Sequence, residues 1–360
     1  MGCSVESRPD EGRVHAMMAA DDIARPLANR ARWGPLETVF WTAALVTLFL
    51  MPSRHLILTQ VAVLGLFALS LDLILGYAGI LSLGHAAFFG LGAYTAGLLA
   101  AHGVINEPLL ALLAAGALAA LFGLMTSVLI LRGSDLTRLM VTLGVALMLR
   151  ELANKLDWLT GGADGLQGIV MPPLFGIFPF DIAGHLSYAY SLAVLFVMFL
   201  LARRLVNSPF GLSLRAIKAN RLRCAAIGIA VDRRLIAIYT IAAGYAGVAG
   251  ALLAQTTQFA SLDVLGFERS ADVLLVLILG GPGYLYGGLI GALALTLVQD
   301  GLINLTARYW QFWIGLALVV IVLGGDPVRR LCAALARAMR RLPATHASAR
   351  MLGSRHEAGR

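Results

Sequence analysis

The chain has 360 residues, of which 59% are hydrophobic and only 13% are charged. A soluble globular domain has about half apolar and about a quarter charged residues, and the mean hydropathy here is +0.81. The composition therefore excludes an ordinary soluble protein, and the formal net charge of +8 needs no nucleic acid to explain it. We predict an all-α, polytopic integral membrane helical bundle.

Apolar runs recur along the sequence, and most have the length that a helix needs to cross roughly 30 Å of hydrocarbon. None shows the alternation of an outer-membrane barrel strand. We expect about ten transmembrane helices, at residues 36–51, 55–75, 82–101, 108–131, 137–153, 186–203, 233–256, 267–281, 284–303 and 308–325. They form a transmembrane domain of residues 35–326, between an N-terminal tail (1–34) and a basic C-terminal tail (327–360).

The N-terminal segment has no apolar core followed by a small-residue cleavage site, so we expect no secretory signal there. Met17 or Met18 is an alternative start to Met1. Residues 1–34 and 340–360 are expected to be disordered tails.

Basic residues indicate the orientation of the chain. On one side of the predicted topology lie 23 of the 28 Lys and Arg residues. They precede the first span, surround the 204–232 loop or follow Asp326, and include Arg132 and Arg138. Cytoplasmic loops carry the excess of positive charge, so both termini and the 204–232 loop are predicted to be cytoplasmic and the 154–185 loop to lie outside. The basic tail also suits anionic membrane lipid.

Glycine and polar residues gather in one segment, GYAGILSLGHAAFFGLGAYTAG at 76–97. Non-helical backbone at membrane depth is tolerated only where it packs inside the protein or lines a cavity, and broken helices commonly mark a transporter's pathway. Small residues four apart also let helices pack closely, so helix packing and a translocation path are both open. The candidate path residues are Ser82, Gly84, His85, Gly90 and Tyr94.

A second segment, LGGPGYLYGGLIGA at 279–292, interrupts an apolar stretch. Pro282 removes a backbone donor and its ring clashes with the preceding turn, so we predict a true discontinuity of the helix at this point. The further candidate path residues are Gly280, Gly281, Pro282 and Gly283.

Isolated polar residues in the spans indicate no reactive site. A lone intramembrane histidine is costly, and His85 can serve either a structural hydrogen bond or a substrate path. Asp72 and Asp300 lie toward the ends of predicted helices, where we expect water to reach them. The three cysteines share no metal-ligand spacing, and no phosphate-binding loop or catalytic constellation is present. We predict no catalytic residue, metal site or cofactor in this chain, which should not hydrolyse ATP itself.

The cytoplasmic loop reads RLVNSPFGLSLRAIKANRLRCAAIGIAVD. Ser208 followed by Pro209 predicts a helix start, with serine at the cap and proline in the first turn. A basic surface and a partly apolar surface follow, the latter formed by Leu214, Ile217, Leu222, Ala225 and Ile229. A helix over 209–228 can lie at the membrane surface or dock into a groove on a soluble partner, and composition favours neither.

Four segments together resemble one family. GYAGILSLGHAAFFGLGAYTAG is similar to the signature of the branched-chain amino acid ABC transporter permeases, specifically the LivM-type subunit. SPFGLSLRAIKANRLRCAAIGI resembles that family's coupling loop, SADVLLVLILGGPGYLYGGLIGA its third signature, and LTGGADGLQGI at 159–169 the LivM-type outer loop. The similarity runs from about residue 55 to 325 in one register.

The resemblance implies a permease subunit of an ATP-driven importer in the bacterial inner membrane. The implied partners are a sister permease, two cytoplasmic ATPases that bind ATP and Mg, and a periplasmic solute-binding protein. The loop helix then becomes the coupling helix, and the matching residues are Phe210, Gly211, Arg215, Ala216, Ala225 and Gly228. Many ABC coupling motifs carry Glu-Ala-Ala, whereas this chain has Arg-Ala-Ile there, so the acidic contact is absent.

The resemblance leaves the substrate open. Branched-chain or other hydrophobic amino acids are the expected cargo, but relatives handle urea, short amides or organic acids with similar signatures. An ion-coupled secondary transporter would also have about ten helices and broken segments. The spans 55–153 and 233–325 have opposite orientations, as inverted repeats require. Their Gly-rich breaks fall at non-equivalent positions, however, and no coupling-ion site is evident, so ATP-driven import is the prediction.

Overall fold

The computed structural model describes residues 35–50, 54–105, 107–131, 133, 135–173, 184–305, 312–313 and 315–316. Within them the chain is helical, apart from loops and an isolated β-bridge between Leu166 and Ala260. The helices that approach membrane length are α2 (Pro35–Leu50), α3 (His55–Leu75), α4 (Ala86–Ala101), α5 (Pro108–Ile130), α6 (Asp135–Lys155), α8 (His185–Val206), α11 (Val231–Thr257), α12 (Phe267–Gly280) and α13 (Leu285–Leu305). Shorter helices are α7 (Asp157–Thr160), η2 (Gly162–Asp164), α9 (Pro209–Ala219), α10 (Arg221–Ala226) and η3 (Leu262–Leu265).

The prediction of an all-helical polytopic bundle is confirmed. Among the described residues, five helices are long and apolar enough to cross a membrane, namely 55–78, 108–130, 185–206, 231–257 and 285–303. The apolar helices 37–50 and 86–101 are shorter. At 1.5 Å per residue α12 is only about 21 Å long, less than the hydrocarbon core. The predicted span 308–325 and both predicted tails lie outside the described residues.

The chain divides into two compact units, residues 1–297 and 298–360. The first unit contains every helix up to α12 and most of α13. In the second unit the structure describes the end of α13 and an edge-to-face contact between the rings of Phe312 and Trp313, whose centroids are 5.7 Å apart.

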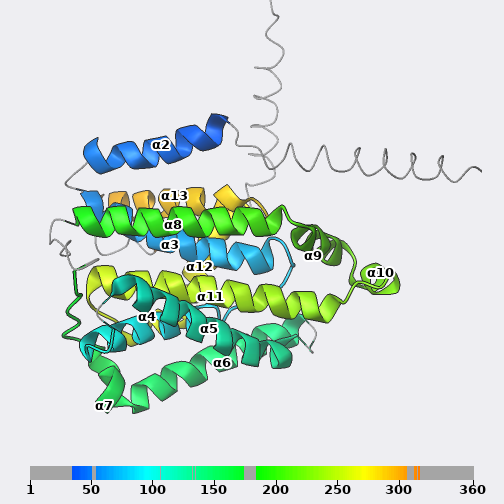
Figure 1. Cartoon of the computed structure of the whole chain (residues 1–360), viewed down its shortest axis with the longest axis horizontal. Coiled ribbons are helices and arrows are strands. Elements are labelled where there is room, and N and C mark those ends of the chain that lie inside the picture. Colours follow the sequence, from blue (N-terminus) through cyan, green and yellow to red (C-terminus); the bar gives the residue numbers. More distant parts are fainter. Residues whose placement is uncertain are drawn as a thin grey trace, which may run out of the picture. The chain divides into compact units, whose positions relative to one another are not determined.

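Helix α11 forms the centre of the first unit and packs against α5, α4 and α3 (Figure 1). Close approach explains the small residues along it. A Cβ atom placed on Gly92 of α4 would overlap the carbonyl oxygen of Gly247, and one on Gly250 would overlap that of Phe89. Small residues at such crossings let membrane helices approach backbone to backbone. The glycines of α4 therefore serve helix packing, as one of the two interpretations of this segment predicts.

Two irregular segments interrupt the bundle. Residues 281–284 separate α12 from α13, which confirms the predicted discontinuity at Pro282. Residues 76–85 separate α3 from α4, so the predicted helix start at residue 82 was wrong and α4 begins at Ala86. The reason is tertiary: the Leu83 amide donates to Thr142 Oγ1 at 3.3 Å, and Gly84 lies against the Thr142 carbonyl of α6. A regular helix would not bring these backbones together.

Candidate functional site: a basic platform beside two helix breaks

The long basic loop folds as two short helices. Ser208 caps α9 as predicted, because its side chain accepts a hydrogen bond from the Gly211 amide at 3.4 Å and Pro209 occupies the first turn. The single helix expected over 209–228 was wrong. Asn220 is extended, and its side-chain oxygen accepts from the Arg223 amide at 3.0 Å, which starts α10 in a new direction. The sequence pattern did not reveal this second cap.

One face of α9 is anchored to the bundle. The side chains of Leu214 and Ile217 are fully buried. Arg234, in the first turns of α11, donates a 2.7 Å hydrogen bond from Nη1 to Ser213 Oγ, and its guanidinium lies 5.9 Å from the centre of the Phe210 ring. The helix is therefore held by both apolar burial and a charged contact from α11.

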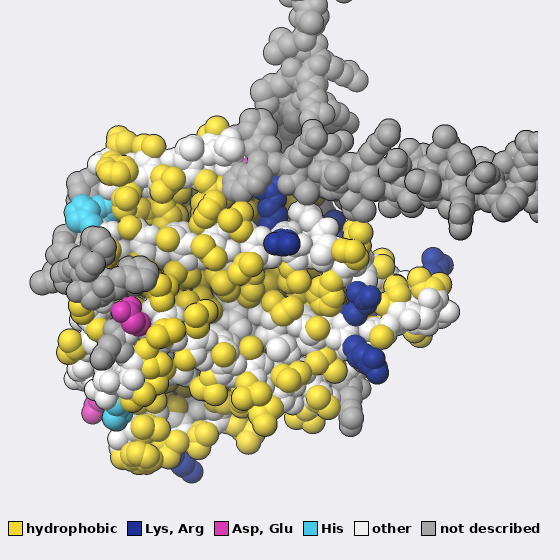
Figure 2. Space-filling view, in the orientation of Figure 1, with side chains coloured by type: hydrophobic (Ala, Val, Ile, Leu, Met, Phe, Trp, Pro, Cys, Tyr) yellow, Lys and Arg dark blue, Asp and Glu magenta, His cyan; other side chains and the backbone are white. Residues whose placement is uncertain are grey.

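The opposite surface of the loop is exposed. Leu222 is 84% exposed and Ile227 is 76% exposed, so the apolar pattern predicted from sequence is buried in α9 but not in α10. Of the residues that match the coupling motif, Ala216, Ala225 and Gly228 are also exposed. Figure 2 shows most of the visible Lys and Arg side chains grouped at this end of the unit. We call the exposed surface of α9 and α10 the basic platform.

The candidate path residues around α4 are tightly packed. Ser82 and His85 are buried. His85 Nε2 shares a 2.8 Å hydrogen bond with Ser70 Oγ, and its ring stacks on Phe67 with centroids 5.7 Å apart. Such contacts support the structural interpretation of this histidine.

The first turns of α4 and α12 lie side by side, because the Ala86 amide donates to Ser270 Oγ at 2.9 Å. Further along α4, Gly90 lies against Leu265 of η3. Tyr94 is buried in the same helix. These residues line a closed interface between α4, η3 and α12 in this structure.

The break between α12 and α13 is close to the end of α3. Gly280 lies against the Gly287 carbonyl, while Pro282 is exposed. Gly281 and Gly283 both have φ of +89°, a left-handed conformation that glycine adopts without strain. The Gly283 amide donates a 2.7 Å hydrogen bond to Asp72 Oδ1.

Asp72 corrects one prediction. It was expected near water, yet its side chain is 0% exposed. Its backbone carbonyl accepts from the Gly76 amide at 2.7 Å and from the Tyr77 amide at 3.2 Å. Lys218 of α9 donates from Nζ to the Gly76 carbonyl at 2.7 Å. The two predicted sets of residues, the coupling loop and the α12–α13 break, therefore meet at the Gly76 turn (residues 76–79).

Sequence reasoning identified neither Asp72 nor Lys218 as a member of this site. An intramembrane carboxylate is a signal of function or of a specific partner, and Asp72 carried that signal. The contacts with α9 and the break join residues 142 and 211 positions apart, and no local pattern pairs them.

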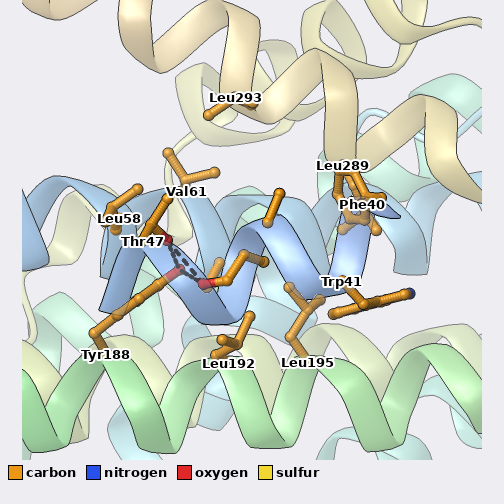
Figure 3. A pocket seen from close by; sticks show the side chains of 13 residues that line it. Phe40, Trp41, Thr47, Leu58, Val61, Tyr188, Leu192, Leu195, Leu289 and Leu293 are labelled. Atoms are coloured by element: carbon orange, nitrogen blue, oxygen red, sulfur yellow. Dashed lines mark hydrogen bonds between the residues drawn. The ribbon is translucent and has the colours of Figure 1, made fainter. Parts of the chain in front are cut away.

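Two apolar cavities lie elsewhere, beside α2. One of about 210 Å³ is lined by residues of α2, α3, α8 and α13, and Figure 3 shows the aliphatic and aromatic side chains that line it. Its polar atoms bond one another, since the Tyr188 hydroxyl donates to the Ala44 carbonyl at 2.9 Å and lies 2.9 Å from Thr47 Oγ1. A second cavity of about 420 Å³ lies between α2 and α8. No candidate path residue lines either cavity.

Within the described residues no group of three or more His, Cys, Asp or Glu side chains is placed to hold a metal ion. The buried Cys224 is a free thiol. The site consists of helix ends, glycine turns and a few charged contacts.

Comparison with known proteins identifies the kind of molecule. The chain is 30% identical over 260 residues to the high-affinity branched-chain amino acid transport system permease protein LivM of Escherichia coli, covering 65% of this chain and 60% of the relative. The LivM protein of Salmonella typhimurium is 30% identical over 269 residues, with 68% and 62% covered. The chain thus spans about three fifths of the length of these relatives.

Other relatives are named for the import of a different cargo. The autoinducer 2 import system permease protein LsrC of an Enterobacter species is 30% identical over 241 residues, with 64% of this chain and 65% of the relative covered. No solved structure matches the chain.

A family described as the permease component of branched-chain amino acid transport systems matches residues 54–323. The match covers every helix from α3 to α13 and contains the Gly76 turn, both breaks and the basic platform. It confirms the predicted resemblance and the prediction of a transport subunit rather than an enzyme. This multi-pass membrane protein belongs to the branched-chain amino acid transport permease family.

Proposed function

We propose that the chain is the transmembrane permease subunit of an ATP-binding cassette importer. The observation that carries the proposal is the basic platform: an exposed surface on two short helices whose inner side is anchored at the Gly76 turn. A docking helix must present one face to its partner and transmit force through the other. The burial of Leu214 and Ile217 and the exposure of Leu222 and Ile227 meet both needs.

The partners follow from that role. Two cytoplasmic ATPases bind ATP and Mg and meet the basic platform. The motif residues are Phe210, Gly211, Arg215, Ala216, Ala225 and Gly228. Of these, Ala216, Ala225 and Gly228 are exposed to a partner and Phe210 and Arg215 are half-buried, whereas the buried Gly211 lets α9 pack against the Val206 carbonyl. A sister permease completes the transmembrane pore, and a periplasmic solute-binding protein delivers the cargo. This chain supplies no catalytic group and no cofactor of its own.

The proposed topology has about ten spans in the bacterial inner membrane, with both termini in the cytoplasm. The charge asymmetry supports this orientation. In the structure, the ends of α8 and α11 that carry Arg203, Arg204, Arg233 and Arg234 adjoin the basic platform. The described part of the loop between α6 and α8, residues 156–173, lies at the other end of these helices and faces the periplasm.

The translocation path runs past the two irregular segments. Ser82, Gly84, His85, Gly90 and Tyr94 lie on the α4 side, and Gly280, Gly281, Pro282 and Gly283 lie on the α12–α13 side. Backbone that leaves the helical conformation at membrane depth is stable only when it packs in protein or lines a water-filled cavity. The packed arrangement described above represents a closed path, and opening requires the α4, η3 and α12 interface to separate.

The proposed cargo is a branched-chain or other hydrophobic amino acid, as the names of the LivM relatives suggest. Urea, short amides and organic acids are the alternatives within the same family. The autoinducer 2 importers among the relatives illustrate that one permease architecture serves unlike cargoes. An ion-coupled carrier is the less favoured alternative, because the described segment contains no cluster of carboxylates for a coupling ion.

The test is transport by the reconstituted complex. The chain is co-expressed with the ATPases, sister permease and binding protein encoded by neighbouring genes, and leucine uptake into proteoliposomes is measured. We expect uptake that requires both ATP hydrolysis and the binding protein. Uptake by this chain alone, driven by an ion gradient, would contradict the proposal. A ligand screen on the binding protein then separates the cargo classes.

A further inference from the structure

The end of α3 is a junction of three elements. Asp72 accepts the Gly76 and Tyr77 amides with its backbone carbonyl and the Gly283 amide with Oδ1. A Cβ atom on Gly76 would lie 2.6 Å from the Gly283 nitrogen, so the turn and the break are in direct contact. Any displacement of the turn therefore acts on the α12–α13 break.

Helix α9 holds the same turn from its cytoplasmic side. The Lys218 ammonium donates to the Gly76 carbonyl at 2.7 Å, and its aliphatic stem covers Gly79, where a Cβ atom would lie 3.0 Å from Lys218 Cγ. One turn earlier, the Arg215 guanidinium lies 5.2 Å from the centre of the Tyr77 ring. The last two turns of α9 therefore contact residues 76–79.

Charge reinforces this junction. The Asp72 carboxylate is buried, and Oδ2 has no hydrogen-bond partner among the described residues. The Lys218 ammonium, which donates to the Gly76 carbonyl at 2.7 Å, brings an opposite charge to the same turn. Because a buried charge is costly without a compensating one, withdrawal of Lys218 would weaken the state in which Asp72 holds the Gly283 amide. Movement of α9 therefore has a direct energetic consequence at the break.

The two sides of the junction differ in stiffness. The α3 side is regular helix packed in the core, whereas the break consists of glycines at φ of +89° around an exposed proline. Hinges absorb conformational change at such element ends. The break is thus the part of the junction that can rearrange when α9 moves.

We infer that Lys218 and Asp72 are positioning residues, an inference that rests on the proposed import function. They link displacement of α9 to the α12–α13 break through the Gly76 turn. The link makes the break an ATP-responsive gate element, although it lies outside the basic platform itself.

The experiment measures the break directly. In a version of the chain without its native cysteines, Tyr284→Cys reports on the break, since Tyr284 is 75% exposed. The maleimide labelling rate is measured in the complete complex with and without ATP plus vanadate. We expect the rate to change when the ATPases are trapped closed. Absence of bound ATPases in this parent complex would instead defeat the proposed function.

Four variants then test the link. Asp72→Asn keeps the side-chain size and an acceptor oxygen but removes the charge, and Lys218→Met removes the opposite charge. Each should abolish most of the ATP-dependent labelling change while ATPases stay bound. The labelling change in the double variant should be no smaller than in the more affected single variant, because both substitutions weaken the same junction at the Gly76 turn and such effects are not additive. Lys218→Arg should restore much of the response.

Lys155→Met is the matched control, because Lys155 is an exposed lysine at the C-terminal end of α6 and makes no contact with the Gly76 turn among those described above. It should leave the labelling change intact. Full ATP-dependent labelling changes in Asp72→Asn and Lys218→Met complexes that retain their ATPases would overturn the link. Loss of ATPase binding in Lys218→Met, with an intact response in Asp72→Asn, would also overturn it by making Lys218 a docking residue.

Discussion

The Gly283 amide donates a 2.7 Å hydrogen bond to Asp72 Oδ1, and so joins the α12–α13 break to the end of α3. The contact places a glycine-rich break against a helix whose next turn is held by α9. A backbone amide left without a hydrogen-bond partner in the hydrocarbon of a membrane costs roughly several kcal/mol of free energy. The hydrogen bond explains how a non-helical segment is stable at this position.

The α4–α11 crossing should tolerate no side chain. Gly92→Ala places a Cβ atom against the Gly247 carbonyl oxygen, and overpacking of this kind typically costs about 1–3 kcal/mol. We expect a lower midpoint of thermal unfolding in detergent. Gly144→Ala is the control, because nothing lies within 4 Å of its added atom, and its midpoint should be equal or higher. Equal midpoints for both variants would contradict the close crossing.

Arg234 should hold α9 on the bundle. Arg234→Met removes the hydrogen bond to Ser213 and the cation–π contact with Phe210, a loss of about 1–2 kcal/mol. Amide hydrogen exchange across 209–219 should then accelerate by about tenfold. Its neighbour Arg233 is exposed, and Arg233→Met should leave exchange in α9 unchanged. Equal exchange in the two variants would show that apolar burial alone anchors the helix.

The motif residues should govern ATPase association. Arg215→Glu reverses the charge that faces Tyr77. Gly228→Trp places a side chain at φ of +86°, where residues other than glycine are strained. Both variants should co-purify less ATPase while inserting normally into the membrane. Undiminished co-purification in both would mean that the docking surface lies elsewhere.

The orientation has its own test. With the native cysteines replaced, Leu222→Cys reports on the basic platform and Trp158→Cys on α7, since these side chains are 84% and 78% exposed. A membrane-impermeant maleimide added to spheroplasts should label only Trp158→Cys. Both should be labelled after lysis. Labelling of Leu222→Cys alone in intact spheroplasts would reverse the proposed topology.

Much of the fold follows from local features that the sequence displays. Apolar runs separated by charged or glycine-rich breaks locate the nine long helices of the described residues, which are α2 to α6, α8 and α11 to α13. Ser208 with Pro209 starts α9, and Pro282 ends the continuity of α12. Each of these depends on the length of an apolar run, a cap or a missing donor. Such features act over a few residues and can be recognised without tertiary contacts.

The parts that escaped prediction depend on distant partners. Residues 82–85 are not helical because α6 supplies Thr142 as their partner. Asp72 is buried where the Gly283 amide bonds its side chain, and Lys218 bonds the Gly76 turn that follows, both from elements far along the chain. The bend at Asn220 is a local feature, because the Asn220 side chain caps α10. It was missed because the apolar and basic pattern of residues 209–228 continues through it without interruption. The meeting of coupling loop and helix break was therefore visible only in three dimensions.

The most direct test of the central claim is photo-crosslinking at the basic platform. Benzoylphenylalanine replaces Leu222 in one variant and Trp158 in the other, and each complete complex is irradiated in its native membrane. We predict a covalent product with an ATPase subunit from position 222 and none from position 158. A crosslink to ATPase from position 158, or none from position 222 in a complex active in uptake, would contradict the account.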